Sequence, residues 1–305
     1  MSDFSQYLDQ VRAKLTGAGT VSGEKDINYG HQFTIIKGSD KAVLTVYNGK
    51  KGRRLVWGGA DSPLQRQLIE LVEGKAGSFL EADAAGAMPQ FNGIWAGSDE
   101  SGKGDFFGPL VVAAVVVDNT TAAKLRAAGV KDCKLLSDKK ILELEDVIKA
   151  SVIDSSVLEL KPRAYNLRYS QVTANGENLN QLLSYGHIAA LTQVLERQAN
   201  CSGALIDQFT KSNVIINTLK SRFPTMTFRQ QPKAESDLAV AAASVLARAR
   251  FLRTMDELAL LAGEDELPKG GGDGATACAQ KIAARLGRQA LGDFVKLHFA
   301  NYRRM

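Results

Sequence analysis

Short apolar runs alternate with helical patterns from residue 91 onward, and this alternation constrains the fold more than any other feature. Apolar runs that predict strands occur at residues 94–99, 110–118, 152–160, 204–207 and 226–229. Apolar residues at helical spacing predict helices at residues 177–197, 212–222, 236–261 and 275–286. Strands that alternate with helices are typical of a layered α/β domain.

The first part of the chain has a different pattern. A helix is predicted at 4–15, strands at 33–36, 42–47 and 54–57, and a second helix at 62–72. Residues 84–89 contain Gly, Ala and Pro without periodicity, as linkers often do. We therefore predict a small α+β domain at 1–83, a linker at 84–90 and the α/β domain at 91–305.

Composition excludes several classes of protein. The 305 residues are 45% hydrophobic and 23% charged, which is the balance of a globular protein, and the net charge of +5 slightly favours anionic partners. The longest apolar runs, 110–117 and 238–247, are too short to span a membrane. The three cysteines are far apart and form no CxxC motif, so we expect neither disulfides nor zinc. A cytoplasmic monomer without an obligate protein partner is the expectation.

Acidic residues stand where apolar strands end or where a helix begins. These are Asp99 with Glu100, Asp207, and Glu235 with Asp237. Because buried carboxylates need a cation, several that converge indicate a metal site, and oxygen ligands favour Mg²⁺ or Mn²⁺. Each acid could also be a turn or cap residue, and Glu235 and Asp237 could interact only with a helix dipole.

The segment after the first acidic pair is rich in glycine. Consecutive strand residues point to opposite faces, so Asp99 and Glu100 reach one site only if the strand breaks there. Ser101, Gly102, Lys103 and Gly104 make such a break plausible, and the glycines let backbone N–H groups approach a sugar or phosphate. The spacing does not fit a P-loop.

Positive charges occur in two further places. The turn at 48–54 carries Lys50, Lys51, Arg53 and Arg54, and it is either a phosphate contact or a solvated hairpin tip. The long helix at 236–261 carries Arg248, Arg250 and Arg253, whose face we predict to be solvated.

Several motifs together resemble bacterial ribonuclease HIII. The run GSDESGKGDFFGP at 97–109 carries the resemblance most strongly. Matching segments follow in order: NLN at 178–180 with His187, LIDQF at 205–209, KAESDLAVAAASVLAR at 233–248 and KLHF at 296–299. The resemblance covers residues 91–305, and the first domain looks like the TATA-binding-protein-like domain of that family by position and size.

The resemblance implies a ribonuclease H-like fold with a mixed central sheet and a site of four carboxylates. By motif these metal-binding and catalytic residues are Asp99, Glu100, Asp207 and Glu235. Asp237 is the alternative to Glu235, since the related ribonucleases HII have an Asp in the comparable segment. The implied enzyme is an endoribonuclease that uses two Mg²⁺ or Mn²⁺ ions about 3.5–4 Å apart to cut the RNA strand of RNA–DNA hybrids, leaving 3′-hydroxyl and 5′-phosphate ends.

Substrate recognition is implied in the same way. The backbone at Ser101, Gly102, Lys103 and Gly104 resembles the family loop that reads 2′-hydroxyl groups. The first domain would help to grip the hybrid, with Lys50, Lys51, Arg53 and Arg54 as local candidates. Two other functions are the alternatives: a ribonuclease HII-like enzyme that cuts at single ribonucleotides in DNA, and a protein that binds hybrids without cutting them.

Overall fold

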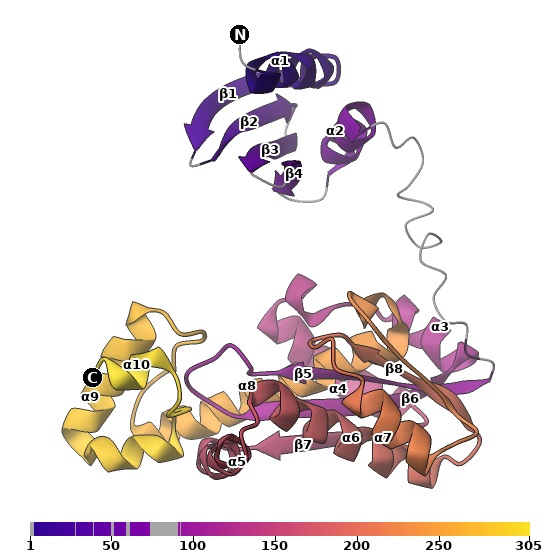
Figure 1. Ribbon diagram of the computed structural model, residues 1–305, viewed down its shortest axis with the longest axis vertical. Helices are drawn as coiled ribbons and strands as arrows, with labels where there is room; N and C mark the ends of the chain where they lie inside the picture. Colours follow the sequence, from indigo (N-terminus) through magenta and orange to yellow (C-terminus); the bar gives the residue numbers. More distant parts are fainter. Residues whose placement is uncertain are drawn as a thin grey trace. The chain divides into compact units, whose positions relative to one another are not determined.

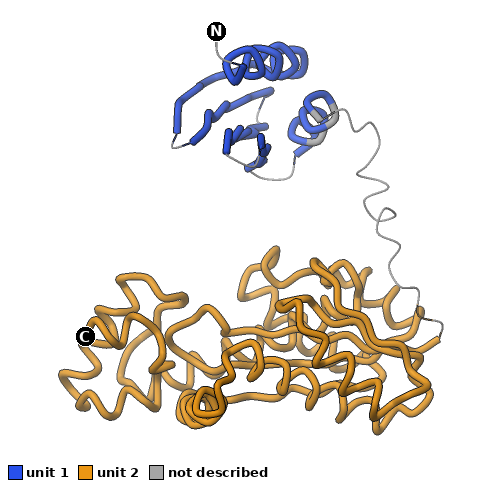
Figure 2. Tube along the Cα trace, viewed as in Figure 1, with its two compact units in different colours: residues 1–88 blue, residues 89–305 orange. Residues whose placement is uncertain are grey.

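The computed structural model describes residues 3–27, 29–38, 40–49, 52–58, 62–73, 91 and 93–305. The chain forms two compact units, residues 1–88 and residues 89–305 (Figure 2). The predicted linker at 84–90 lies outside the described residues, and the domain limits drawn from the sequence stay a prediction.

An antiparallel sheet and two helices form the first unit (Figure 1). Its elements are α1 (Asp3–Thr16), β1 (Thr20–Ile27), β2 (Gly30–Lys37), β3 (Asp40–Gly49), β4 (Gly52–Gly58) and α2 (Pro63–Glu73), with strand order β1-β2-β3-β4. Phe33 and Leu44 of the sheet and Leu15 and Leu68 of the helices are fully or almost fully buried in one core. Both predicted helices and the three predicted strands are present, whereas β1 was not predicted.

A five-stranded mixed sheet is the centre of the second unit. Its strands are β5 (Ile94–Ser101), β6 (Leu110–Asp118), β7 (Asp154–Leu160), β8 (Cys201–Asp207) and β9 (Thr227–Gln231), in the order β7-β6-β5-β8-β9. β5, β8 and β9 run parallel, and β6 is antiparallel to both β5 and β7. The five predicted strands are confirmed.

Helices cover both faces of this sheet (Figure 1). They are α3 (Asn119–Ala127), α4 (Asp138–Ser151), α5 (Pro162–Ala174), α6 (Leu179–Arg197), α7 (Val214–Arg222), α8 (Leu238–Ala262), α9 (Asp273–Leu286) and the short α10 (Ala300–Arg303). Of these, α6, α7, α8 and α9 were predicted, and α3, α4, α5 and α10 were not. No helix in the described parts of the chain is long and apolar enough to cross a membrane.

Strand β6 shows that the sheet is buried on both faces. Val111 and Val115 pack in the core formed with α8, whereas Val112 and Val116 pack in the core formed with α6 and α7. Because alternate residues of a strand point to opposite faces, a strand between two helical layers is apolar throughout. The uninterrupted apolar run of β6 therefore follows from its place in the middle layer.

Close packing brings α8 against β5. A Cβ atom on Gly97 would lie 2.3 Å from the backbone nitrogen of Val240, so only glycine allows this approach. Asp237 caps the start of α8, accepting hydrogen bonds from the N–H groups of Ala239 at 2.8 Å and Val240 at 3.3 Å. Gly97 and this cap together hold the first turn of α8 beside the strand that carries Asp99.

Candidate active site

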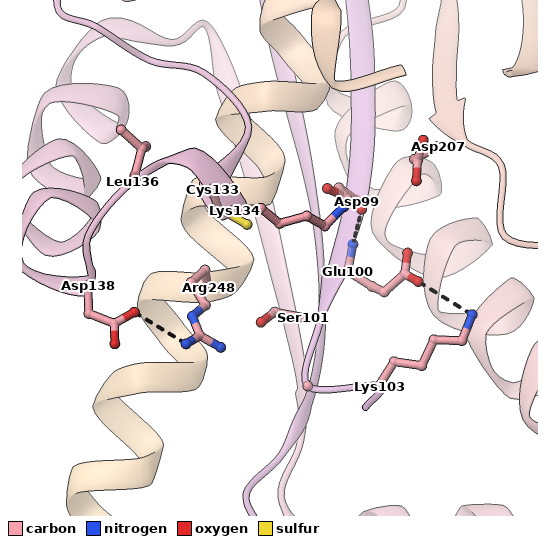
Figure 3. Close-up of a pocket in the computed structure, with 11 residues that line it drawn as sticks. Asp99, Glu100, Ser101, Lys103, Cys133, Lys134, Leu136, Asp138, Asp207 and Arg248 are labelled. Carbon is pink, nitrogen blue, oxygen red and sulfur yellow. Dashed lines mark hydrogen bonds and ion pairs between the residues drawn. The ribbon is translucent and has the colours of Figure 1, made fainter. Parts of the chain in front are cut away.

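Three of the predicted carboxylates line one pocket. Asp99 and Glu100 stand at the carboxyl end of β5, and Asp207 is the last residue of β8. These strands are parallel neighbours, with Ser98 paired to Ile206, so their ends meet at one edge of the sheet. The pocket has a volume of about 500 Å³, and the acidic side chains approach it from the two strands (Figure 3).

Asp99 and Glu100 enter the pocket from opposite faces of β5. The strand stays regular through Ser101 and turns at Gly102, inside the segment where the break was predicted. A break at the acidic pair itself is not needed for both side chains to reach the pocket. Asp99 lies on the face of Gly97, which packs on α8, and Glu100 lies on the face that packs on α6. The pocket extends around the end of the strand, and this is why both side chains line it.

Asp99 is buried and has few compensating partners. Its side chain accepts a hydrogen bond of 2.8 Å from the backbone N–H of Glu100. Burial, together with the negative charges of Glu100 and Asp207, raises the pKa of Asp99 well above its ordinary value, and that hydrogen bond opposes the shift only in part. Asp99 is therefore the carboxylate in most need of a cation.

Glu100 has a more favourable environment. Its Oε2 lies 3.2 Å from Nε2 of His187, and its Oε1 lies 3.8 Å from Nζ of Lys103. Burial raises the pKa of Glu100, but the hydrogen bond to His187 and the positive charge of Lys103 outweigh it, so the net shift is downward. The pKa values of the two adjacent acids are thus shifted in opposite directions.

The fourth predicted acid is close to the others without lining the pocket. The backbone N–H of Ala234 donates to Asp207 at 3.1 Å and holds the turn Ala234–Ser236, which carries Glu235, next to β8. Glu235 is half-buried, and its charge acts on Lys134, which does line the pocket. Asp237 is occupied elsewhere, because it caps α8 and accepts from the indole N–H of Trp95 at 3.1 Å.

The glycine-containing segment forms the pocket rim next to Glu100. Ser101, Gly102 and Lys103 line the pocket, and Gly104 does not. Gly102 has a φ of 89°, and a Cβ atom there would lie 2.1 Å from the carbonyl oxygen of Pro109. No other residue fits that turn, which places the following backbone beside the acids.

The opposite wall of the pocket was not predicted from the sequence. It consists of Cys133, Lys134, Leu136, Asp138 and Arg248. The side chain of Lys134 extends toward Asp99 (Figure 3). Burial lowers the pKa of Lys134, but the carboxylates of Asp132 and Asp99 outweigh it and the net shift is upward. Its only sequence signal is a charged loop before a helix, and the position of that loop depends on tertiary packing.

The arginines predicted to be solvated on α8 are paired with acids. Arg248 lies 3.2 Å from Asp138 at the pocket wall, Arg250 lies 2.6 Å from Glu159, and Arg253 lies 2.7 Å from Glu145. The prediction is confirmed for Arg253, which is exposed despite its ion pair. It is wrong for Arg248, which forms part of the pocket wall, because α4 supplies a carboxylate that no local pattern in α8 reveals.

The candidates in the first unit are only partly described. Lys50 and Lys51 lie outside the described residues. Arg53 forms an ion pair with Asp3, and its guanidinium lies 4.6 Å from the ring centre of Tyr7. Arg54 is exposed on β4. Of the two described arginines, Arg54 is therefore the more accessible to a phosphate.

The donor set of the pocket fits a hard divalent cation. It consists of carboxylate oxygens. The pKa of Asp99 is raised first by burial and then by the negative charges of Glu100 and Asp207, which a cation would offset. Among the described residues, no three carboxylate, imidazole or thiolate groups are gathered as the ligands of one ion. In Figure 3 the side chain of Glu100 extends toward Lys103 and not toward Asp99.

Solved structures share this architecture. The crystal structure of Bst-RNase HIII in complex with Mn²⁺ has a TM-score of 0.63 and 29% identity, covering 100% of this chain and 96% of that one. Ribonuclease H2 from Pyrococcus horikoshii OT3 has a TM-score of 0.56 and 23% identity over 69% of this chain and 96% of its own, a likeness of fold alone. The second unit is a ribonuclease H-like α/β domain with an acidic pocket.

Sequence comparisons identify the family. The sequence model of the family Ribonuclease HII matches residues 96–302. A ribonuclease HIII of Protochlamydia amoebophila is 37% identical over 67% of this chain and 65% of its own length, and one of Chlamydia pneumoniae is 36% identical over 68% of each. The chain belongs to the ribonuclease HII family and, within it, to the ribonucleases HIII. The matched region spans about two thirds of the length of these relatives.

Proposed function

We propose that the chain is an endoribonuclease that hydrolyses the RNA strand of RNA–DNA hybrids and leaves 3′-hydroxyl and 5′-phosphate ends. One observation carries the proposal: Asp99, Glu100 and Asp207 line a single pocket beside Gly102 and Lys103 in a chain of the ribonuclease HII family. The pocket offers acids for metal binding and a backbone rim for the sugar of the RNA strand.

Asp99, Glu100, Asp207 and Glu235 would hold two Mg²⁺ or Mn²⁺ ions. When bound, such ions supply an activated water and stabilise the negative charge on the leaving oxygen. The protein contributes the surrounding charge. Lys103 and Lys134 stand on two sides of the acids, where they would attract a phosphate and limit repulsion between it and the carboxylates.

Recognition of RNA would use the backbone at Ser101, Gly102, Lys103 and Gly104. A 2′-hydroxyl both donates and accepts hydrogen bonds, so backbone groups on the pocket rim can distinguish ribose from deoxyribose. Phosphate contacts would add affinity without base readout.

The first unit would be a TATA-binding-protein-like domain that grips the hybrid. Residues 1–88 carry 11 basic and 10 acidic side chains, so binding of the hybrid must come from a local patch, such as one around the exposed Arg54 on β4. We also propose that the protein acts as a cytoplasmic monomer without an obligate protein partner.

A panel of labelled substrates tests the function. The wild type should cut the RNA strand of a hybrid internally in Mg²⁺ or Mn²⁺, leave 5′-phosphates, and lose activity in EDTA. Single-stranded RNA and double-stranded RNA should resist cleavage. Preference for a DNA duplex with one ribonucleotide would instead indicate a ribonuclease HII-like substrate range, and binding of hybrids without cleavage in either metal would refute the enzyme.

Variants connect that activity to the pocket. Asp207→Asn should abolish cleavage, whereas Asp146→Asn, which makes the same change at an exposed position on α4, should cut like the wild type. Equal loss in both variants would show that the amide change acts on the fold and not on the chemistry.

A further inference from the structure

A buried histidine contacts the acidic pair from the α6 face of β5. His187 lies on α6 and is fully buried. Ser98 and Glu100 are two residues apart on β5, so both point toward this helix. Nδ1 of His187 lies 2.8 Å from Oγ of Ser98, and Nε2 lies 3.2 Å from Oε2 of Glu100.

These two partners hold both nitrogens of the ring. An ionised carboxylate only accepts hydrogen bonds, so Nε2 must carry the proton that is shared with Glu100. Nδ1 and the Ser98 hydroxyl share the second hydrogen bond of the ring. Both ring nitrogens thus have partners, as a fully buried ring requires.

Stacking fixes the plane of the ring. The ring centres of His187 and Phe209 are 5.1 Å apart with an angle of 24° between their planes. Nζ of Lys103 lies 5.1 Å from the centre of the same phenyl ring. The contacts therefore form a closed circuit. Glu100 contacts His187 and Lys103, and Phe209 contacts both of these.

The two oxygens of Glu100 consequently differ. Oε2 is held by His187, which has no room to move, whereas Oε1 faces Lys103 at 3.8 Å on the pocket rim. At 3.8 Å this ion pair is longer than a hydrogen bond, so a divalent ion can take the place of the lysine at Oε1. Oε1 is thus the oxygen that remains available to the pocket.

We propose that His187 is a positioning residue for the active site: its Nε2–H fixes Oε2 of Glu100 so that Oε1 is presented for a divalent ion. The proposal rests on the proposed function. Hydrogen-bond partners behind metal ligands commonly change metal affinity or activity by about 10–100-fold. His187 would change metal affinity and activity by about this factor without contacting the substrate.

Two substitutions separate the hydrogen bond from the packing. His187→Phe keeps a ring that can stack on Phe209 but removes both nitrogens, whereas His187→Gln places an amide N–H near the position of Nε2. For His187→Phe we expect Mn²⁺ affinity by calorimetry and kcat to fall by about 10–100-fold, with KM for the hybrid unchanged. His187→Gln should recover most of both, and His298→Gln is the matched control outside the pocket.

The outcomes distinguish the inference from the function on which it rests. Wild-type protein that does not cut hybrids refutes the function. Wild-type protein that cuts, with Mn²⁺ affinity and kcat unchanged in folded His187→Phe, overturns the positioning role, as does an equal loss in His187→Gln. If His187→Phe does not fold, the Mn²⁺ affinity of Ser98→Ala is the test. A fall smaller than the about 10–100-fold expected for His187→Phe supports the proposal, and unchanged affinity overturns it.

Discussion

The two faces of strand β5 hold neighbouring carboxylates in different ways. On the α6 face, Glu100 is bonded to His187 and faces Lys103, and its pKa is lowered. On the α8 face, Asp99 has a backbone N–H and a more distant Lys134, and burial raises its pKa. The difference shows that the fold positions one acid with side-chain partners and compensates the charge of the other poorly.

The largest expected effect separates two acids at the start of α8. Glu235→Gln should lower kcat for hybrid cleavage by a factor on the order of 10²–10³, as loss of a group that stabilises charge in the transition state often does. Asp237→Asn should cleave like the wild type, because an Asn caps a helix about as well as an Asp. Steady-state cleavage of both variants is the measurement, and the reverse result would make Asp237 the ligand.

The next prediction concerns the loop that follows β5. Nζ of Lys296 donates to the carbonyl oxygens of Asp105 at 2.9 Å and Gly108 at 2.8 Å, and burial lowers the pKa of Lys296 to about 7. Between pH 7 and its ordinary pKa of 10.5, the unfolded chain binds more protons than the folded protein. The free energy of unfolding should therefore rise with pH in that window, by at most about 1.4 kcal/mol per pH unit.

Lys296→Met is the control for this pH dependence. The variant should be less stable than the wild type, because two buried carbonyl groups lose a donor, and its stability should lack the contribution that rises with pH. Denaturant unfolding at several pH values measures both. Identical pH profiles for the two proteins would show that Lys296 stays charged in the fold.

A smaller effect tests the packing of the α8 face. Gly97→Ala should lower the free energy of unfolding by about 1–3 kcal/mol, because its methyl group would meet the backbone of Val240. Gly104→Ala provides the comparison, since a Cβ atom there meets no other atom within 4 Å. Thermal unfolding of both variants gives the answer, and equal stability would mean that α8 can shift without cost.

The smallest effect contrasts the two acids directly. In EDTA, Glu100→Gln should lose about 1 kcal/mol of stability with its charge-assisted hydrogen bond to His187. Asp99→Asn should gain up to about 1 kcal/mol, because the amide removes a buried charge that the fold compensates poorly. Chemical denaturation measures the difference, and shifts of the same sign would remove the contrast between the faces.

Much of this fold follows from local sequence patterns. Strands β6 and β8 could be predicted because burial on both faces gives each of them an uninterrupted apolar run in the sequence. The acid at the end of β8 is recognisable because it ends such a run. Strand β1 is different: almost all of its residues are exposed, so no alternation of polar and apolar side chains marks it. Its place depends on pairing with β2.

Only part of the pocket could be predicted from the sequence, for a similar reason. Asp99, Glu100 and Asp207 stand at the ends of recognisable strands. Lys134 and Arg248 come from a loop and a helix that meet these acids only in the folded chain. The contact between His187 and Glu100 joins residues 87 positions apart. Sequence patterns identify candidate ligands better than they identify the residues that orient them.

Asp99→Asn in a single hybrid assay is the most direct test of the acidic pocket. Binding and cutting of one labelled RNA–DNA hybrid would be recorded together for wild type and variant in Mn²⁺. We predict that the variant binds the hybrid as the wild type does and no longer cuts it, with 5′-phosphate products only from the wild type. Cutting by the variant at the wild-type rate would show that the chemistry lies elsewhere.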